Sequence, residues 1–149
     1  SIKDLDLLPF SIHHDTREPL AYRAESGDKH CAIATDLGCF DEYTIKHLQD
    51  SDVLLLEANH DIAILEKGPY PLELKRRILS DYGHLSNESS AALLGTIMGG
   101  RLRKVFLGHL SKENNEPELA LKTIRKNLSE KELAISVAKH GEISEIVEW

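Results

Sequence analysis

Val53-Leu54-Leu55-Leu56-Glu57-Ala58-Asn59-His60-Asp61 joins an unbroken apolar run to a cluster of polar side chains. The run 53–56 has the pattern of a strand that is buried on both faces. The polar residues follow it directly, and loops at strand ends are where functional sites are usually built. This stretch therefore predicts a sheet-centred fold with a site at one edge of the sheet.

Strand-like and helical patterns alternate on both sides of this stretch. Further strands are predicted at 7–14, 22–24, 30–34 and 104–107, and two short ones at 133–137 and 143–147 with Gly141 at their turn. Helices are predicted at 41–49, 72–79, 87–98 and 116–127. Strands that alternate with helices favour an α/β layer in which helices cover apolar strands.

The composition is that of a globular protein. The chain has 149 residues, of which 41% are apolar and 29% are charged. That length predicts one compact domain, which we take as residues 1–149, able to bury about two-thirds of its unfolded surface. No apolar run approaches the roughly 20 residues that span a bilayer, and no leader pattern opens the chain. We therefore expect no membrane partner and a cytoplasmic location.

Cysteine content and charge narrow the function classes. Cys31 and Cys39 lack metal-pair spacing and are too few for a disulfide framework, so both are expected to be reduced. The formal net charge of -7 argues against a simple nucleic-acid-binding module, because such binding neutralises phosphates with Lys and Arg. It does not exclude a nuclease, since metal ions can supply local positive charge.

Four segments place a His or Asp directly after a strand-like run, where side chains can converge at one sheet edge. They are 11–15, 34–38, 56–61 and 106–111. Imidazole and carboxylate suit zinc or manganese, and an Asp that bridges two such ions is common. A fifth segment, 82–87, puts His84 at the start of a helix, where backbone N–H groups favour a phosphate.

Each segment alone has a structural interpretation. A single His at a strand end is often only hydrogen-bonded, Asp36 before Leu37-Gly38 suits a turn, and Asn59 or Asp61 could cap a helix that begins near Ile62. Only the five segments together, in this order along the chain, indicate a function.

In order, these motifs resemble those of the YycJ/WalJ group of metallo-β-lactamase-fold proteins. The most specific are Gly68-Pro69-Tyr70-Pro71 followed by Lys75, Arg77 and Ile78, then 83–87, then 108–115. The resemblance covers essentially the whole chain. It implies the C-terminal half of an αββα sandwich, with a mixed sheet flanked by helices.

The resemblance also implies a site for two divalent metal ions, zinc or manganese, of the kind found in tRNase Z and related phosphodiesterases. His14 would bind one ion, Asp36 would bridge both ions, and His109 would bind the other. His13 is the competing choice for the first ligand.

His84 resembles a histidine that contacts the scissile phosphate and can act as a general acid, and Glu57 would orient its imidazole. Four polar residues could donate hydrogen bonds to substrate phosphates, with helix capping as the alternative. They are Ser111, Asn114, Asn115 and Asn87. The basic run 75–77 could face a nucleic-acid backbone, although a solvated helix face is the simpler interpretation.

One departure from the family is large. The His-x-His-x-Asp-His motif of this fold is absent from the chain, because in the family it belongs to an N-terminal half. One side of the site supplies too few ligands, so the chain alone is expected to be inactive. Half of a sandwich would also expose one sheet face. We expect the missing half, or a second copy in a homo-oligomer, to cover that face.

The activity implied by the resemblance is hydrolysis of DNA by a 5′-to-3′ exonuclease that uses a two-metal-activated water. Two alternatives remain at this stage. The same fold could act on a small phosphodiester, or the chain could be a non-catalytic binding or assembly domain.

Overall fold

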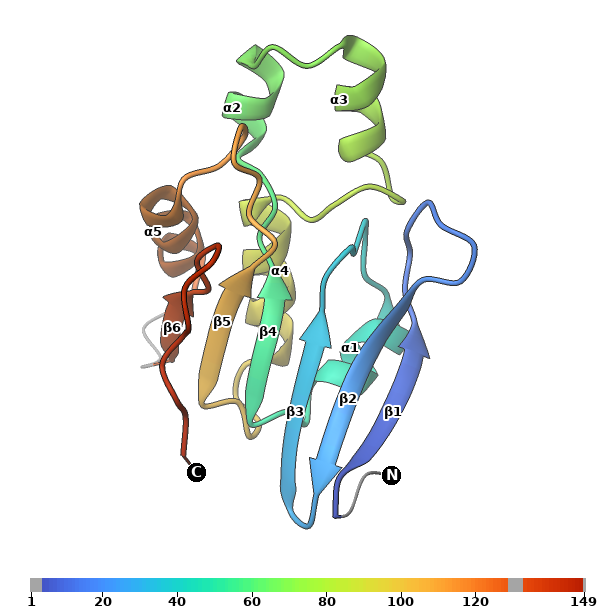
Figure 1. Cartoon of the computed structure of the whole chain (residues 1–149), viewed down its shortest axis with the longest axis vertical. Coiled ribbons are helices and arrows are strands. Elements are labelled where there is room, and N and C mark those ends of the chain that lie inside the picture. The colour runs from blue at the N-terminus through green and yellow to red at the C-terminus, as the bar shows by residue number, and fades with distance from the viewer. Residues whose placement is uncertain (1–3, 129–132, 149) are drawn as a thin grey trace.

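A six-stranded mixed sheet forms the centre of the computed structural model, which describes residues 4–128 and 133–148 (Figure 1). The strands lie side by side in chain order. β1 to β3 are antiparallel, whereas β3 to β6 run parallel. Their bounds are β1 Asp6–Ser11, β2 Leu20–Ser26, β3 Lys29–Ala34, β4 Val53–Glu57, β5 Lys104–Gly108 and β6 Ala134–Val137.

Helices cover one face of this sheet and extend beyond one of its edges. Each parallel connection from β3 to β6 leads to the neighbouring strand, and right-handed crossovers bring their helices to the same face. α1, α4 and α5 lie on that face, whereas α2 and α3 stand beyond the carboxyl ends of the parallel strands (Figure 1). The bounds are α1 Glu42–Leu48, α2 Ile62–Lys67, α3 Leu72–Ile78, α4 Asn87–Ile97 and α5 Pro117–Asn127.

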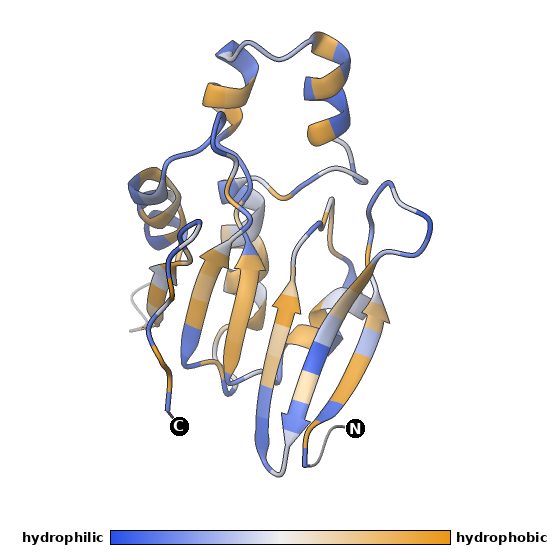
Figure 2. Ribbon diagram, viewed as in Figure 1, coloured by the Kyte–Doolittle hydropathy of each residue, from blue (hydrophilic) through white to orange (hydrophobic). Residues whose placement is uncertain are grey.

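The helix-covered face carries the core. In β4, Leu54 and Leu56 are fully buried, and the same alternation buries Val105 and Leu107 in β5. The opposite face is open, because Val53 and Leu55 are only half-buried. Burial of β4 on both faces, as its apolar run predicts, is therefore wrong within the described chain. Figure 2 shows that the apolar colouring of the central strands extends along most of their length.

Most predicted elements match the structure to within a few residues, because their ends are fixed by local contacts. Asp41, Asp61 and Ser86 each accept a backbone N–H at the start of a helix. The first strand ends at Ser11 rather than at 14, since the backbone of His13 instead accepts a hydrogen bond from Gly38 N (2.8 Å).

The predicted strand at 143–147 is wrong. This segment has no ladder in the described chain, and side chains hold it instead. Glu145 pairs with Lys104 and accepts a hydrogen bond from Ser136 Oγ (2.9 Å), which ties the tail to the sheet. No helix among the described residues is long and apolar enough to cross a membrane.

Candidate metal centre

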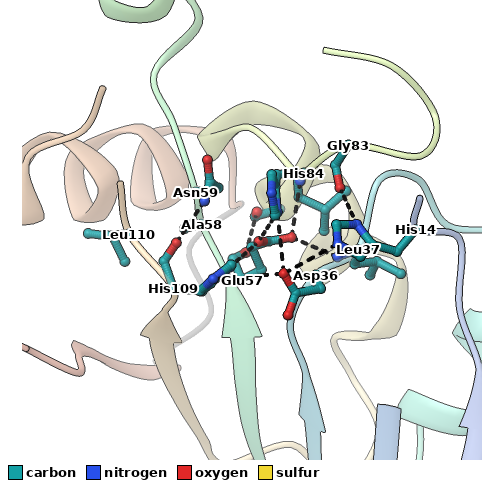
Figure 3. Close-up of polar contacts among 12 residues, drawn as sticks. His14, Asp36, Leu37, Glu57, Ala58, Asn59, Gly83, His84, His109 and Leu110 are labelled. Carbon is teal, nitrogen blue, oxygen red and sulfur yellow. Dashed lines mark hydrogen bonds and ion pairs between the residues drawn. The ribbon is translucent and has the colours of Figure 1, made fainter. Parts of the chain in front are cut away.

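Three imidazoles surround one carboxylate oxygen at the carboxyl ends of the parallel strands (Figure 3). Asp36 Oδ1 lies 3.6 Å from His14 Nε2, 3.8 Å from His109 Nε2 and 3.8 Å from His84 Nδ1. Asp36 follows β3 and His109 follows β5, so parallel pairing brings residues far apart in sequence to one edge. The structure thus brings together every residue that was predicted to bind metal.

The tautomers of the two predicted ligand histidines suit metal binding. His14 Nδ1 donates to Gly83 O (3.0 Å), and His109 Nδ1 donates to Glu57 Oε1 (2.6 Å). A proton fixed on Nδ1 leaves the Nε2 lone pair for a metal ion, and both Nε2 atoms face Asp36. His13, the competing choice, lies outside the cluster and contacts Asp41 Oδ2 at 3.3 Å.

The donor set fits a divalent ion. Two ligands bonded at about 2.1 Å across a tetrahedral angle lie roughly 3.4 Å apart, close to the 3.6 Å and 3.8 Å found between the Asp36 carboxylate and the two Nε2 atoms. His14, Asp36 and His109 would hold the metal from this chain.

The hydrogen bonds of Glu57 favour a positioning role over metal binding. This residue is 0% exposed, and its carboxylate accepts from His84 Nδ1 (2.8 Å), His109 Nδ1 (2.6 Å) and the backbone N–H groups of Leu37 and Leu85. Although Asp36, Glu57, His84 and His109 present ligand atoms within 4.8 Å of one another, these four hydrogen bonds occupy Glu57. The set with His14 is therefore the better ligand set.

The charged forms of Glu57 and His109 stabilise each other. Burial alone would raise the pKa of Glu57, but hydrogen bonds from His109 and His84 hold that pKa below its usual value. In turn, the hydrogen bond to Glu57 raises the pKa of His109. The structure contains the hydrogen bond through which Glu57 was predicted to orient His84, whereas the contact between Glu57 and His109 was not predicted from the sequence.

Backbone strain coincides with two of the candidate ligands. Asp36 has φ of 58° and His109 has φ of 55°, and among the described residues no other non-glycine residue has a positive φ. Such conformations cost about 1–3 kcal/mol each and persist where surrounding structure enforces them, often at functional sites.

Of the four residues predicted to contact substrate, only Ser111 lines the cavity above the cluster. Asn87 and Asn115 exchange amide hydrogen bonds of 3.0 Å and 2.9 Å, and both are buried. Asn114 is also buried and donates to Ser111 Oγ. These contacts favour structural roles for the three asparagines, in place of substrate binding.

The basic residues of α3 also have structural partners. Lys75 Nζ donates to Glu66 O and Gly68 O, both at 2.7 Å, and Arg77 forms an ion pair with Asp15. The hydrogen bond from Arg77 lowers the pKa of Asp15. Within this run, Arg76 alone remains as an exposed cation with no contact in the described structure.

His60 lies in the polar segment 56–61, but no role was predicted for it from the sequence. Its ring is 1% exposed, and neither ring nitrogen has a hydrogen-bond partner among the described residues. Burial lowers the pKa of His60 to about 4. The imidazole is therefore neutral at neutral pH, buried behind the cluster.

Sequence comparisons identify relatives of the chain. No protein-family model matches the sequence. The chain is 42% identical over 134 residues to the exodeoxyribonuclease WalJ of Streptococcus pneumoniae, and 33% identical over 135 residues to the exodeoxyribonuclease YycJ of Bacillus anthracis. These matches cover 90% and 91% of the chain. The chain is homologous to half of a WalJ/YycJ protein. It spans 50% and 51% of the length of these two relatives.

Solved structures confirm the predicted fold class. The metallo-β-lactamase fold protein YhfI from Bacillus subtilis matches 95% of the chain with 49% of its own length, at a TM-score of 0.67 and 14% identity. Zn²⁺-bound PqqB from Methylobacterium extorquens matches 97% with 52% of its own length, at a TM-score of 0.60 and 17% identity. Like its WalJ/YycJ relatives, these structures are about twice as long as the matched region, so the chain forms half of a metallo-β-lactamase fold.

Replacement of Glu57 by Gln is expected to lower the pKa of His109 toward its ordinary value. The reason is that Gln cannot stabilise the imidazolium by charge. Zn²⁺ affinity should also fall by about 10- to 100-fold, the usual cost of losing a group that orients a ligand. NMR titration of the histidine ring protons and competition with a chromophoric chelator measure the two effects. The exposed Glu66→Gln is the control, and an unchanged His109 titration in Glu57→Gln would contradict the assignment.

His60 predicts a loss of stability in mild acid. The unfolded chain protonates this imidazole near pH 6.5 and the folded chain only near pH 4, so the unfolded state binds more protons between these values. Stability should therefore fall as the pH drops through this window, by up to about 3 kcal/mol from His60. Urea unfolding at several pH values should give a shallower dependence for His60→Gln than for the wild type or for exposed His140→Gln. Equal slopes in all three proteins would show that His60 does not contribute.

Proposed function

We propose that this chain supplies one side of the active site of a metal-dependent phosphodiesterase, and that the complete protein is an exodeoxyribonuclease that digests DNA in the 5′-to-3′ direction. The observation that carries the proposal is the pair of imidazoles, His14 and His109, whose Nε2 atoms face Asp36 Oδ1. The names of the WalJ and YycJ relatives support DNA as the substrate.

In this proposal, two divalent ions, zinc or manganese, are held on this side by His14, Asp36 and His109. Bound ions of this kind lower the pKa of a water and stabilise charge on the attacking and leaving oxygens. His84 acts as the general acid. Since Nδ1 of His84 donates to Glu57 (2.8 Å), Nε2 of the imidazole is left to face the phosphodiester and to give a proton to the leaving oxygen.

A small phosphodiester is the second candidate substrate. The net charge of -7 favours it, because an acidic chain offers little general attraction to a polyanion. A panel of substrates separates the two candidates, since activity confined to mononucleotide esters would displace the exonuclease. A non-catalytic domain is the third candidate, and it predicts no hydrolysis of either class.

The complete protein is expected to have a mass well above 16.7 kDa and to contain two metal ions. Replacement of His84 by Ala should lower kcat on end-labelled DNA by about 10²- to 10⁴-fold, the usual contribution of a general acid. His14→Ala and His109→Ala should also lose bound metal. His13→Ala is the matched control, because His13 contacts Asp41 outside the cluster. A metal-free protein of 16.7 kDa without activity, or equal losses in His13→Ala and His84→Ala, would contradict the proposal.

We further propose that the complementary half of the fold covers the open sheet face. On this face Leu7 and Tyr22 are 45% exposed and Ile33 is 48% exposed. These side chains belong to three adjacent strands, so they form a continuous apolar surface. A half that covers this face would also approach the site from the side on which this chain offers no ligand.

The 149-residue chain alone should bind a hydrophobic dye and associate with itself, since monomers rarely expose a continuous apolar face. Ile33→Lys should reduce both signals in the isolated chain and weaken binding of the complementary half. Leu79→Lys is the control, because Leu79 is similarly exposed but follows α3, away from the sheet. Dye fluorescence and sedimentation measure the outcome. A stable monomer that binds no dye would rule out a buried role for this face, and stable dimers that the complementary half does not displace would identify a second copy as the cover.

A further inference from the structure

The cavity above the candidate metal ligands has an apolar wall that the proposed hydrolysis does not use. The cavity has a volume of about 410 Å³ and is lined on one side by His14, His84 and His109. Its other lining includes Tyr70, Leu74 and Ile78, from α3 and the segment before it. This volume lies within the range of about 300–1,000 Å³ found for small-ligand sites, which is enough for one nucleotide.

This wall is not part of the folding core. Tyr70 is half-buried, and its hydroxyl has no hydrogen-bond partner among the described residues. Neither Tyr70, Leu74 nor Ile78 belongs to the buried cluster that holds the sheet and its helices together. An aromatic and two aliphatic side chains beside a polar site are thus left accessible to a ligand.

The wall is nevertheless held in a fixed position relative to the cluster. His84 N donates to Ile78 O (3.0 Å), which joins the end of α3 to the candidate general acid. At the other end, Lys75 Nζ bonds to Gly68 O, and a Cβ on Gly68 would lie only 3.0 Å from Asn114 Oδ1. The Gly68-Pro69-Tyr70-Pro71 motif therefore holds Tyr70 in a turn whose position is fixed by these contacts.

The chemistry of this wall suits a nucleobase. Every base has a flat π-face that stacks on an aromatic side chain, and such stacking contributes about 1–3 kcal/mol per base. A phosphate at the cluster and a base on Tyr70 would occupy the two sides of the same cavity. We propose that Tyr70, supported by Leu74 and Ile78, binds the base of the nucleotide whose phosphate lies at the proposed metal site. This inference rests on the proposed function, and it makes Tyr70 a substrate-positioning residue.

The test uses the complete protein and two oligonucleotides that differ only at the digested end, one intact and one with an abasic terminal residue. Tyr70→Ala should lower kcat/KM on the intact strand by about 5- to 150-fold, which corresponds to the loss of one stacked base. The same variant should remain within about twofold of the wild type on the abasic strand. Tyr70→Phe should retain activity on both strands, and Tyr82→Ala is the control because Tyr82 is 57% exposed and does not line the cavity.

Equal losses of Tyr70→Ala on the intact and abasic strands would overturn the inference, because a structural role affects both substrates alike. A binding measurement keeps the inference separate from the proposed function. The wild type should bind thymidine 5′-monophosphate more tightly than 2-deoxyribose 5-phosphate, with shifts of the Tyr70 ring resonances, and Tyr70→Ala should lose this preference. If the protein digests no DNA but shows the preference, the proposed function fails and the base site stands. If it digests DNA without the preference, the base site fails alone.

Discussion

The buried carboxylate of Glu57 is the interaction on which the site depends. It accepts hydrogen bonds from two histidine rings and from the backbone at Leu37 and Leu85. These donors come from the ends of β3 and β5 and from the segment before α4, so one side chain joins three separate parts of the chain. A buried charge is costly unless it is paired and hydrogen-bonded, and this requirement fixes the geometry of all its donors.

Parallel strand order and two strained backbone conformations also help to bring the candidate ligands together. Because β3, β4 and β5 run parallel and adjacent, Asp36, Glu57 and His109 emerge at the same edge. Asp36 and His109 then turn into the cluster with positive φ, a conformation that few non-glycine residues adopt, although Asp and His adopt it more readily than most. The hydrogen bonds to Glu57 and the packing of the buried strands can offset the cost of these two conformations.

Local features of the sequence were enough to predict most elements and the convergence of the candidate ligands. Helix caps at Asp41 and Ser86 depend on residues three positions away, and a strand-end histidine is visible in one short segment. Contacts between distant residues were not predictable in the same way. The second histidine on Glu57 and the amide pair of Asn87 with Asn115 depend on how β4, α4 and the loop after β5 meet. The apolar run of β4 by itself predicted burial on both faces, because such a run looks the same whether its partner layer is present or absent. The exposed face was expected only from the resemblance to half of a sandwich.

The open face and the one-sided metal centre follow from the same division of the fold. His14, Asp36 and His109 converge on the proposed metal position from the edge of one sheet, while the face beside that edge exposes apolar side chains such as Ile33. If the complementary half covers this face and adds the remaining ligands, metal binding and association of the two halves are thermodynamically coupled. A metal held by both halves stabilises only the assembled state, so its affinity adds to the strength of the interface. Glu57 would then favour both metal binding and assembly without contacting the metal or the other half. It fixes His109 before assembly, so metal binding has less side-chain freedom left to restrict.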